Sequence, residues 1–294
     1  MNELACQFGS DQRLSGILTE PGAGRPHTGL VLVSAGLVPK CGPFRLYAEL
    51  ARHLAEVGVA TLRFDLGGVG DSVEERAGRS LRERTAREIR AAVDAISERY
   101  ALDRLVLGGL CSGAEDSFRA AAGDARVSGV VMIDPFAYRT AGWRVRHLLH
   151  RIARRSLRAA GLYAPIANRA GSGKQARFER PRVVNYEYMD RAESSITLQA
   201  LLHRNAQVHF VYTAGVREVF NHPSQVRAWF PELDFKQLVS VDHFPHIDHT
   251  QLLADDRRTL VEAITARIMP RPPPPGESLP LRLAVGEPVL SPAE

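Results

Sequence analysis

The chain has 294 residues, of which 45% are hydrophobic and 24% are charged. A chain of this length can bury a large core, which favours one sizeable α/β domain over two small ones. Its three cysteines, Cys6, Cys41 and Cys111, argue against a disulfide framework because they are few and odd in number. No stretch approaches the roughly 18 apolar residues of a membrane span, and the N-terminus lacks a secretory leader, so we expect a cytoplasmic protein.

The formal net charge of +5 is unevenly distributed along the chain. Between Arg139 and Arg182 there are twelve Arg or Lys and a single acid, Glu179, which gives a local charge of +11. The rest of the chain therefore carries +5 minus 11, or −6. The basic segment has few aromatic residues and no recognised nucleic-acid-binding motif, so we expect no nucleic-acid partner.

Short apolar runs that alternate with helical patterns set the order of the predicted elements. The predicted strands are Leu4 to Phe8, Arg13 to Leu18, Gly29 to Ser34, Val59 to Phe64, Arg104 to Gly109, Gly129 to Asp134, Gln207 to Thr213 and Lys236 to Val241. Amphipathic helices are predicted at Phe44 to Glu56, Leu81 to Tyr100 and Leu252 to Ile268. Two antiparallel strands followed by a βα alternation indicate an α/β fold with an eight-stranded, mostly parallel sheet and helices on both faces.

One long insertion interrupts this alternation, between the predicted strands that end at Asp134 and begin at Gln207. Connections beyond about 12–15 residues are uncommon unless they are functional, so we interpret residues 135–206 as a helical cap on a core of residues 1–134 and 207–269. A basic amphipathic helix is expected in the cap, with a mobile loop at 168–174. The Pro-rich segment 270–294 is expected to be a disordered tail.

The run Gly109-Leu110-Cys111-Ser112-Gly113 has the form G-x-C-x-G and directly follows a predicted strand. This pattern is typical of a nucleophile elbow, a sharp turn from strand to helix that needs glycines because a Cβ at either flanking position would collide with a neighbouring strand or helix. The turn presents the central side chain above the sheet. We therefore expect Cys111 to be a covalent nucleophile.

A cysteine nucleophile needs a base, and the loop after the last predicted strand holds three histidines. His249 is favoured because it stands just before the final helix, where a loop imidazole can reach back to the elbow. His243 is the second choice and His246 the third.

The base needs an orienting acid, which is expected after the seventh predicted strand. Glu218 follows Gly215 by three residues there and is the first choice. Asp134, at the tip of the strand before the insertion, is the alternative because an acid from the neighbouring strand end can reach the same histidine. The oxyanion hole would combine the backbone N–H groups of Ser112 and Leu37.

Together these motifs resemble the α/β-hydrolase superfamily over residues 5–268. Within it, the segments that resemble the hydrolases associated with bacterial exosortase systems are Gly36-Leu37-Val38, Gly42 to Leu46, Leu62 to Asp65, Gly67 to Ser72 and Gly109 to Gly113. The resemblance implies an α/β-hydrolase fold, with Cys111 as nucleophile, His249 as base and Leu37 as oxyanion donor. The chain departs from the superfamily at the acid, because an Asp is usual where this chain has Glu218.

A thiolate exchanges readily with thioesters and activated esters, so we expect acyl hydrolysis or acyl transfer through an acyl-Cys111 intermediate, without a metal or a cofactor. The basic cap favours an acyl group carried on coenzyme A or on an acidic acyl carrier protein. The alternative is a catalytically silent scaffold of the same fold, whose basic cap binds a partner protein or an anionic surface.

Overall fold

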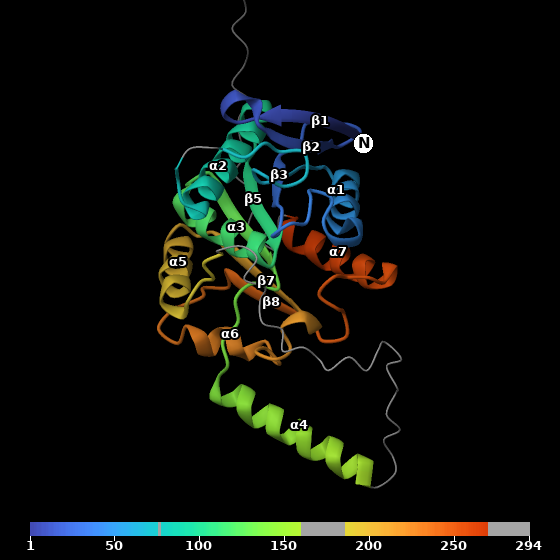
Figure 1. The fold of residues 1–294 in the computed structure, drawn as a ribbon, viewed down its shortest axis with the longest axis vertical. Helices are drawn as coiled ribbons and strands as arrows, with labels where there is room; N and C mark the ends of the chain where they lie inside the picture. The colour runs from blue at the N-terminus through green and yellow to red at the C-terminus, as the bar shows by residue number, and fades with distance from the viewer. Residues whose placement is uncertain (76–77, 160–185, 270–294) are drawn as a thin grey trace, which may run out of the picture.

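A computed structural model describes residues 1–75, 78–159 and 186–269, without the side chains of 154–159. It shows one sheet of eight strands in the order β1-β2-β4-β3-β5-β6-β7-β8, with helices on both sides (Figure 1). The loop expected at 168–174 and the tail expected at 270–294 lie outside the described residues. No described helix has the length and apolar character needed to cross a membrane.

The strands are β1 Asn2–Phe8, β2 Leu14–Glu20, β3 Thr28–Val33, β4 Val59–Phe64, β5 Arg104–Leu110, β6 Val127–Ile133, β7 Gln207–Thr213 and β8 Val239–Phe244. β1 pairs antiparallel with β2 and β2 antiparallel with β4, whereas all other neighbours are parallel. The predicted strands and the mostly parallel sheet are therefore confirmed. β8 starts three residues later than predicted, because Lys236 and Gln237 take positive φ values in a turn before it.

The helices are α1 Leu46–Glu56, α2 Leu81–Arg99, α3 Ser112–Gly123, α4 Ala141–Ala159, α5 Arg191–His203, α6 Ser224–Trp229 and α7 Ala254–Ile268. α1 and α7 cover one face of the sheet, where Leu50, Ile264 and Val131 belong to one buried cluster. α2, α3, α5 and α6 cover the other face, where Ile89 and Phe118 belong to a larger buried cluster. The parallel strands β3 to β7 are therefore buried on both sides, which explains why they read as largely apolar runs, whereas the edge strand β8 is only half-buried.

Between β6 and β7 the chain forms α4 and α5, which differ in how they pack. α5 packs against α3 in the layer that covers the sheet. α4 stands off from the rest of the described molecule, beyond α6 (Figure 1). The division of the chain into a core and a cap stays a prediction. The carboxyl ends of β3, β5, β6 and β7 share one edge of the sheet, which is where ligands bind in open α/β sheets.

Candidate active site

Cys111 lies at the turn between β5 and α3, with φ 54° and ψ −118°. A positive φ is strained for a residue with a side chain and persists only where the surroundings impose it. A Cβ on Gly109 would lie 2.5 Å from the carbonyl carbon of Gly113, and a Cβ on Gly113 would lie 2.5 Å from the carbonyl oxygen of Val33. The collisions predicted for the two glycines are therefore confirmed, and Cys111 is half-buried at the tip of the turn.

The hydroxyl of Tyr47, on α1, holds the strand end just before Cys111. It accepts a hydrogen bond from the amide of Leu110 at 2.7 Å and donates one to the carbonyl of Val33 at 3.1 Å. Tyr47 is completely enclosed, and burial raises the pKa of its hydroxyl, so it stays protonated. Sequence patterns give no sign of this role, because Tyr47 occupies an ordinary buried position of an amphipathic helix.

His249 and Asp134 form a hydrogen-bonded pair beside the elbow. Nδ1 of His249 lies 2.7 Å from Oδ2 of Asp134, whose side chain is fully enclosed. The carboxylate also accepts bonds from the amide of Thr213 at 2.6 Å and from its hydroxyl at 2.5 Å. A Cβ on Gly215 would lie 2.7 Å from Nδ1 of His249 and 2.8 Å from Oδ2 of Asp134, so only glycine fits beside this pair.

The pKa of the His249 imidazole is raised strongly. The hydrogen bond to Asp134 and, second, a hydrogen bond to the side chain of Cys111 raise the pKa of His249 to about 10, against the opposing effect of burial. His249 is therefore an imidazolium at neutral pH. Because Asp134 binds Nδ1, the nitrogen left for the cysteine is Nε2.

The structure corrects our first choice of acid. Glu218 is exposed, and the described interactions of this residue involve its main-chain oxygen, which accepts a hydrogen bond from Arg139 at 3.0 Å. After β7 the chain forms the 3₁₀ turn Ala214–Val216, and Glu218 follows this turn. The alternative, Asp134, is the partner of His249.

The other two candidate bases, His243 and His246, have different surroundings. His243 belongs to the edge strand β8, where its ring meets that of Phe220 edge-on at 5.1 Å and burial lowers its pKa. His246 is exposed in the turn that follows. β8 ends at Phe244 and not at Val241 as predicted, so His243 belongs to the strand and not to the loop after it.

The backbone amides of Leu37 and Ser112 are available near the elbow. Within the described parts of the chain, neither amide has a protein acceptor. The hydroxyl of Ser112 accepts a hydrogen bond from the amide of Gly36 at 2.9 Å and so fixes the turn that carries Leu37. Ser112 is buried and engaged in this contact, which makes it a positioning residue for the loop.

A buried ion pair anchors the other end of the same loop. The fully buried Asp65 accepts hydrogen bonds from the amide of Lys40 at 2.5 Å and from its ammonium group at 2.6 Å, and the ammonium also reaches Asp71 at 2.6 Å. Asp65 further accepts a hydrogen bond from the amide of Asp71 at 3.1 Å. The two aspartates therefore shape loops and do not contact His249.

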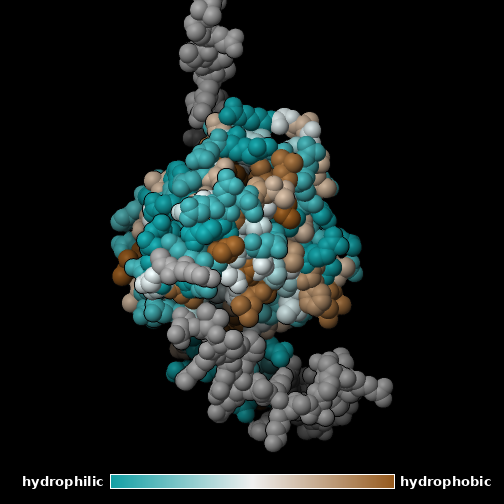
Figure 2. Space-filling view, turned by 45° about the horizontal axis from the view of Figure 1, so that its top comes forward, coloured by the Kyte–Doolittle hydropathy of each residue, from teal (hydrophilic) through white to brown (hydrophobic). Residues whose placement is uncertain are grey.

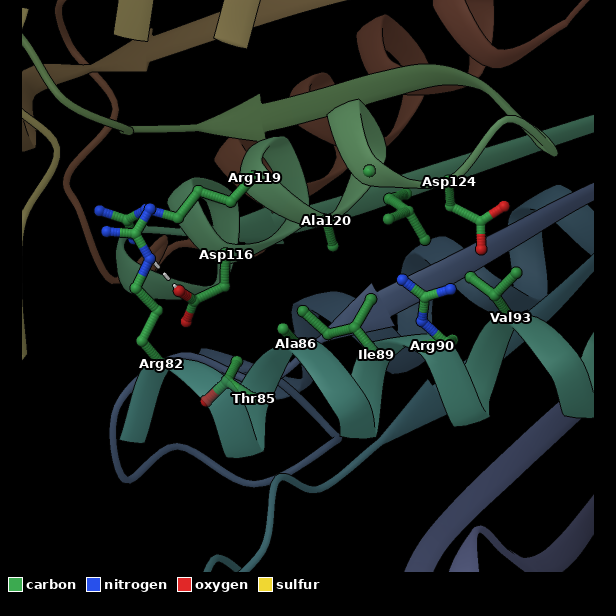
Figure 3. A pocket seen from close by; sticks show the side chains of 12 residues that line it. Arg82, Thr85, Ala86, Ile89, Arg90, Val93, Asp116, Arg119, Ala120 and Asp124 are labelled. Carbon is green, nitrogen blue, oxygen red and sulfur yellow. Dashed lines mark hydrogen bonds and ion pairs between the residues drawn. The ribbon is translucent and has the colours of Figure 1, made fainter. Parts of the chain in front are cut away.

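A cavity of about 230 Å³ lies between α2 and α3 (Figure 3). Its floor is apolar, with Ile89 and Val93 from α2, and Asp116 and Arg119 point into one end from α3. Burial raises the pKa of Asp116 to about 6, partly offset by Arg119. None of Cys111, His249 and Asp134 lines this cavity, so it is separate from the elbow.

Comparison with known families places the chain clearly. A family model described as serine aminopeptidase, S33, matches residues 25–210, which is more than half of the chain. A comparison with curated protein sequences gives no significant match.

Solved structures resemble nearly the whole chain. XC6422 from Xanthomonas campestris, described as an α/β serine hydrolase without lid, is 16% identical with a TM-score of 0.56, covering 93% of this chain and 98% of that one. Est1E from Butyrivibrio proteoclasticus is 14% identical with a TM-score of 0.54, covering 90% and 97%. The dienelactone hydrolase from Anabaena variabilis is 13% identical with a TM-score of 0.53, covering 90% and 95%. These likenesses show the α/β-hydrolase fold.

Proposed function

Because this chain belongs to the serine aminopeptidase S33 family of α/β hydrolases, we propose that it is a hydrolase that cleaves or transfers acyl groups through an acyl-Cys111 intermediate. The observation that carries the proposal is the ordered contact from Asp134 through His249 to Cys111 at a strained elbow. Relatives with this fold are described as serine hydrolases, whereas residue 111 here is a cysteine. The narrower likeness to exosortase-associated hydrolases rests on the sequence motifs alone.

In the proposed reaction the Cys111 thiolate attacks the carbonyl carbon of an ester or thioester. The charge that develops on the carbonyl oxygen is stabilised by the amides of Leu37 and Ser112. The His249 imidazolium gives its proton to the leaving thiolate or alkoxide, which departs and leaves an acyl-Cys111 thioester. Neutral His249 then takes a proton from water or another acceptor as it attacks, and the Cys111 thiolate leaves beside the restored imidazolium.

Asp134 acts through His249 in this scheme. Its carboxylate holds the Nδ1 proton and stabilises the imidazolium, so that Nε2 stays directed at the sulfur. No step needs a metal or a cofactor. Coenzyme A or an acyl carrier protein is the proposed acyl donor, because the sequence between Arg139 and Arg182 carries a charge of +11 that would attract a phosphorylated carrier.

The test is intact-protein and peptide mass spectrometry after incubation with acyl-coenzyme A thioesters of short, medium and long chain. We expect an acyl adduct on the Cys111 peptide, with Cys6 and Cys41 as unmodified internal controls. A second readout is alkylation by iodoacetamide at pH 6.5, which we expect to be at least about tenfold faster at Cys111 than in a model peptide, because an activated cysteine reacts well below the free-thiol pKa of about 8.5.

The catalytically silent scaffold is the competing function. We would adopt it if Cys111 forms no adduct with any thioester or activated ester, reacts no faster than the model peptide, and the Cys111→Ala variant keeps every activity of the parent protein. Adducts on Cys6 or Cys41 in place of Cys111 would overturn the assignment of the nucleophile.

A further inference from the structure

α4 presents a stripe of large apolar side chains to solvent. Val145, Leu148, Leu149 and Ile152 are 58%, 56%, 59% and 52% exposed. Their spacing of i, i+3, i+4 and i+7 puts all four on one side of the helix. The same spacing on α1 is buried against the sheet, so the exposed stripe of α4 is a feature that the fold of the core does not explain.

The opposite side of α4 is the side fastened to the body. The amide of Trp143 donates to the hydroxyl of Thr140 at 3.1 Å, and Nδ2 of Asn221 donates to the carbonyl of Trp143 at 3.2 Å. Nε of Arg146 donates to Oδ1 of the same Asn221 at 2.9 Å, and the guanidinium of Arg139 lies 4.8 Å from the Trp143 ring. Trp143 and Arg146 lie well around the helix from the stripe, so the stripe faces away from the molecule.

Arginines border the stripe along one side. The α4 sequence contains six arginines and no acid, and helical spacing places Arg144 and Arg151 along that border of the stripe. Arginine stems can lie along an apolar surface while their guanidinium groups reach the polar phase. Such a helix has the composition of one that lies in the plane of a lipid–water interface.

A surface of anionic lipid fits these features better than a second copy of the chain. Two α4 helices would bring two sets of six arginines together, which opposes self-association. On the face of the core shown in Figure 2 the surface is mainly hydrophilic, with hydrophobic residues in small groups. α4 projects from the body of the described molecule (Figure 1), which leaves the helix accessible along its length to a flat lipid surface.

We infer that α4 docks the protein on the surface of membranes that contain anionic phospholipid. Val145, Leu148, Leu149 and Ile152 enter the boundary between headgroups and acyl chains, and the flanking arginines bind lipid phosphates. α4 begins seven residues after Asp134 at the carboxyl edge of the sheet, so docking turns the Cys111 edge toward the lipid. The inference concerns binding and stands independently of the acyl chemistry.

Co-sedimentation with sucrose-loaded vesicles tests this inference. Vesicles of phosphatidylcholine with about one third phosphatidylglycerol should bind the full chain, and pure phosphatidylcholine vesicles should bind it far less, because anionic headgroups attract a polybasic helix. The pair Leu148→Glu and Ile152→Glu should weaken binding at least about tenfold. The pair Arg144→Gln and Arg151→Gln should weaken it about 30-fold, at about fivefold for each arginine near the surface.

The matched control is the pair Val73→Glu and Ile196→Glu. It makes the same charge change outside α4, at two apolar side chains that are 62% and 69% exposed. It should reduce binding much less than the α4 pair, and circular dichroism should show unchanged folding for all variants. Equal binding to both vesicle types, or equal loss in the control, overturns the inference. A dimer that depends on Leu148 and Ile152 would instead identify a second copy as the occupant. Binding of polyglutamate that also depends on Leu148 and Ile152 would identify an acidic protein as the occupant.

Discussion

Asp134 owes its place beside His249 to an unusual backbone conformation. It has a φ of +46° at the end of β6, where its amide donates to the carbonyl of Val211 at 2.8 Å. Thr213, at the end of the neighbouring strand, supplies two donors to the carboxylate. Together with His249, these donors give both oxygens of the buried carboxylate a hydrogen-bond partner. Asp134 is therefore placed to accept a hydrogen bond from Nδ1 of His249 and to hold the imidazole in one orientation.

Replacing the carboxylate by an amide tests this role. Asp134→Asn keeps the shape but presents an amide whose fixed donors and acceptor disturb the tautomer of His249, so we expect kcat to fall at least about 100-fold with KM nearly unchanged. Glu218→Gln makes the same chemical change at an exposed side chain and should stay within about twofold of the parent. Steady-state kinetics with a reactive thioester measure both. Equal small losses would mean that neither carboxylate orients the base.

At the scale of elements, the elbow depends on how closely α3 approaches β3. A Cβ on Gly113 would meet the backbone oxygens of Val33 and Ser34 at 2.5 and 2.8 Å, and backbone cannot move aside cheaply. We expect Gly113→Ala to lower the free energy of unfolding by about 2–4 kcal/mol, because overpacking forces the helix away from the sheet. Gly123→Ala is the control in the same helix, since nothing lies within 4 Å of its added Cβ.

The Gly123→Ala variant should be neutral or slightly stabilising, by up to about 1 kcal/mol, because alanine favours the helix. Urea unfolding of the two variants and the parent measures the difference. If Gly113→Ala unfolds at the same urea concentration as Gly123→Ala, then the close approach at the elbow is not a constraint on this fold.

The sequence predicted the elements whose residues are buried on both faces of the sheet. β3, β5 and β7 carry continuous apolar runs, and the flanking glycines of Cys111 mark a turn that no other residue permits. The predicted start of the edge strand β8 was three residues too early. Every position of β8 is only half-buried, so its sequence shows no clear hydrophobic pattern. Boundaries of such strands are set by turns in the preceding backbone rather than by hydrophobicity.

The site was predicted only in part, because its residues come from segments that are far apart in the sequence. His249 follows from its position before the last helix, whereas its partner lies 115 residues earlier in the sequence. Asp134 comes within reach only because β6 and β7 are neighbours and Thr213 turns its donors toward the carboxylate. Tyr47 and the hydroxyl of Ser112 act through contacts between segments more than sixty residues apart, which no local pattern reports.

For the whole molecule, two contacts of carboxylates hold C-terminal segments of the chain together. One is the pair of His249 with Asp134, which connects the last loop to β6. The other joins three elements: Asp242 of β8 lies 3.1 Å from Nε2 of His209 on β7 and 2.9 Å from Arg267 on α7. Burial acts to raise the pKa of Asp242, but the hydrogen bonds to His209 and Arg267 outweigh it and lower the pKa to about 2. The two contacts should therefore fail at opposite ends of the pH scale.

The pH dependence of unfolding separates these contacts. The folded-state pKa of His249 is raised to about 10 from 6.5, so its contribution is complete below pH 6.5 and is lost as the pH rises through 10. The difference in unfolding free energy between the parent and His249→Gln should therefore shrink between pH 6.5 and pH 10. Asp242 has a lowered pKa, so its contribution is present above its unfolded pKa of 3.8 and is lost as the pH falls through about 2.

The difference between the parent and Asp242→Asn should accordingly stay constant from pH 6.5 to pH 10, which makes this variant the internal contrast for His249→Gln. Urea unfolding at several pH values across that window measures both differences on the same footing. A His249→Gln difference that grows with pH would contradict a raised pKa, since a group with a lowered folded-state pKa gains stability as the pH rises. Parallel curves for the two variants would show that the imidazolium form of His249 contributes nothing to folding, and that its contact with Asp134 serves only to orient the ring.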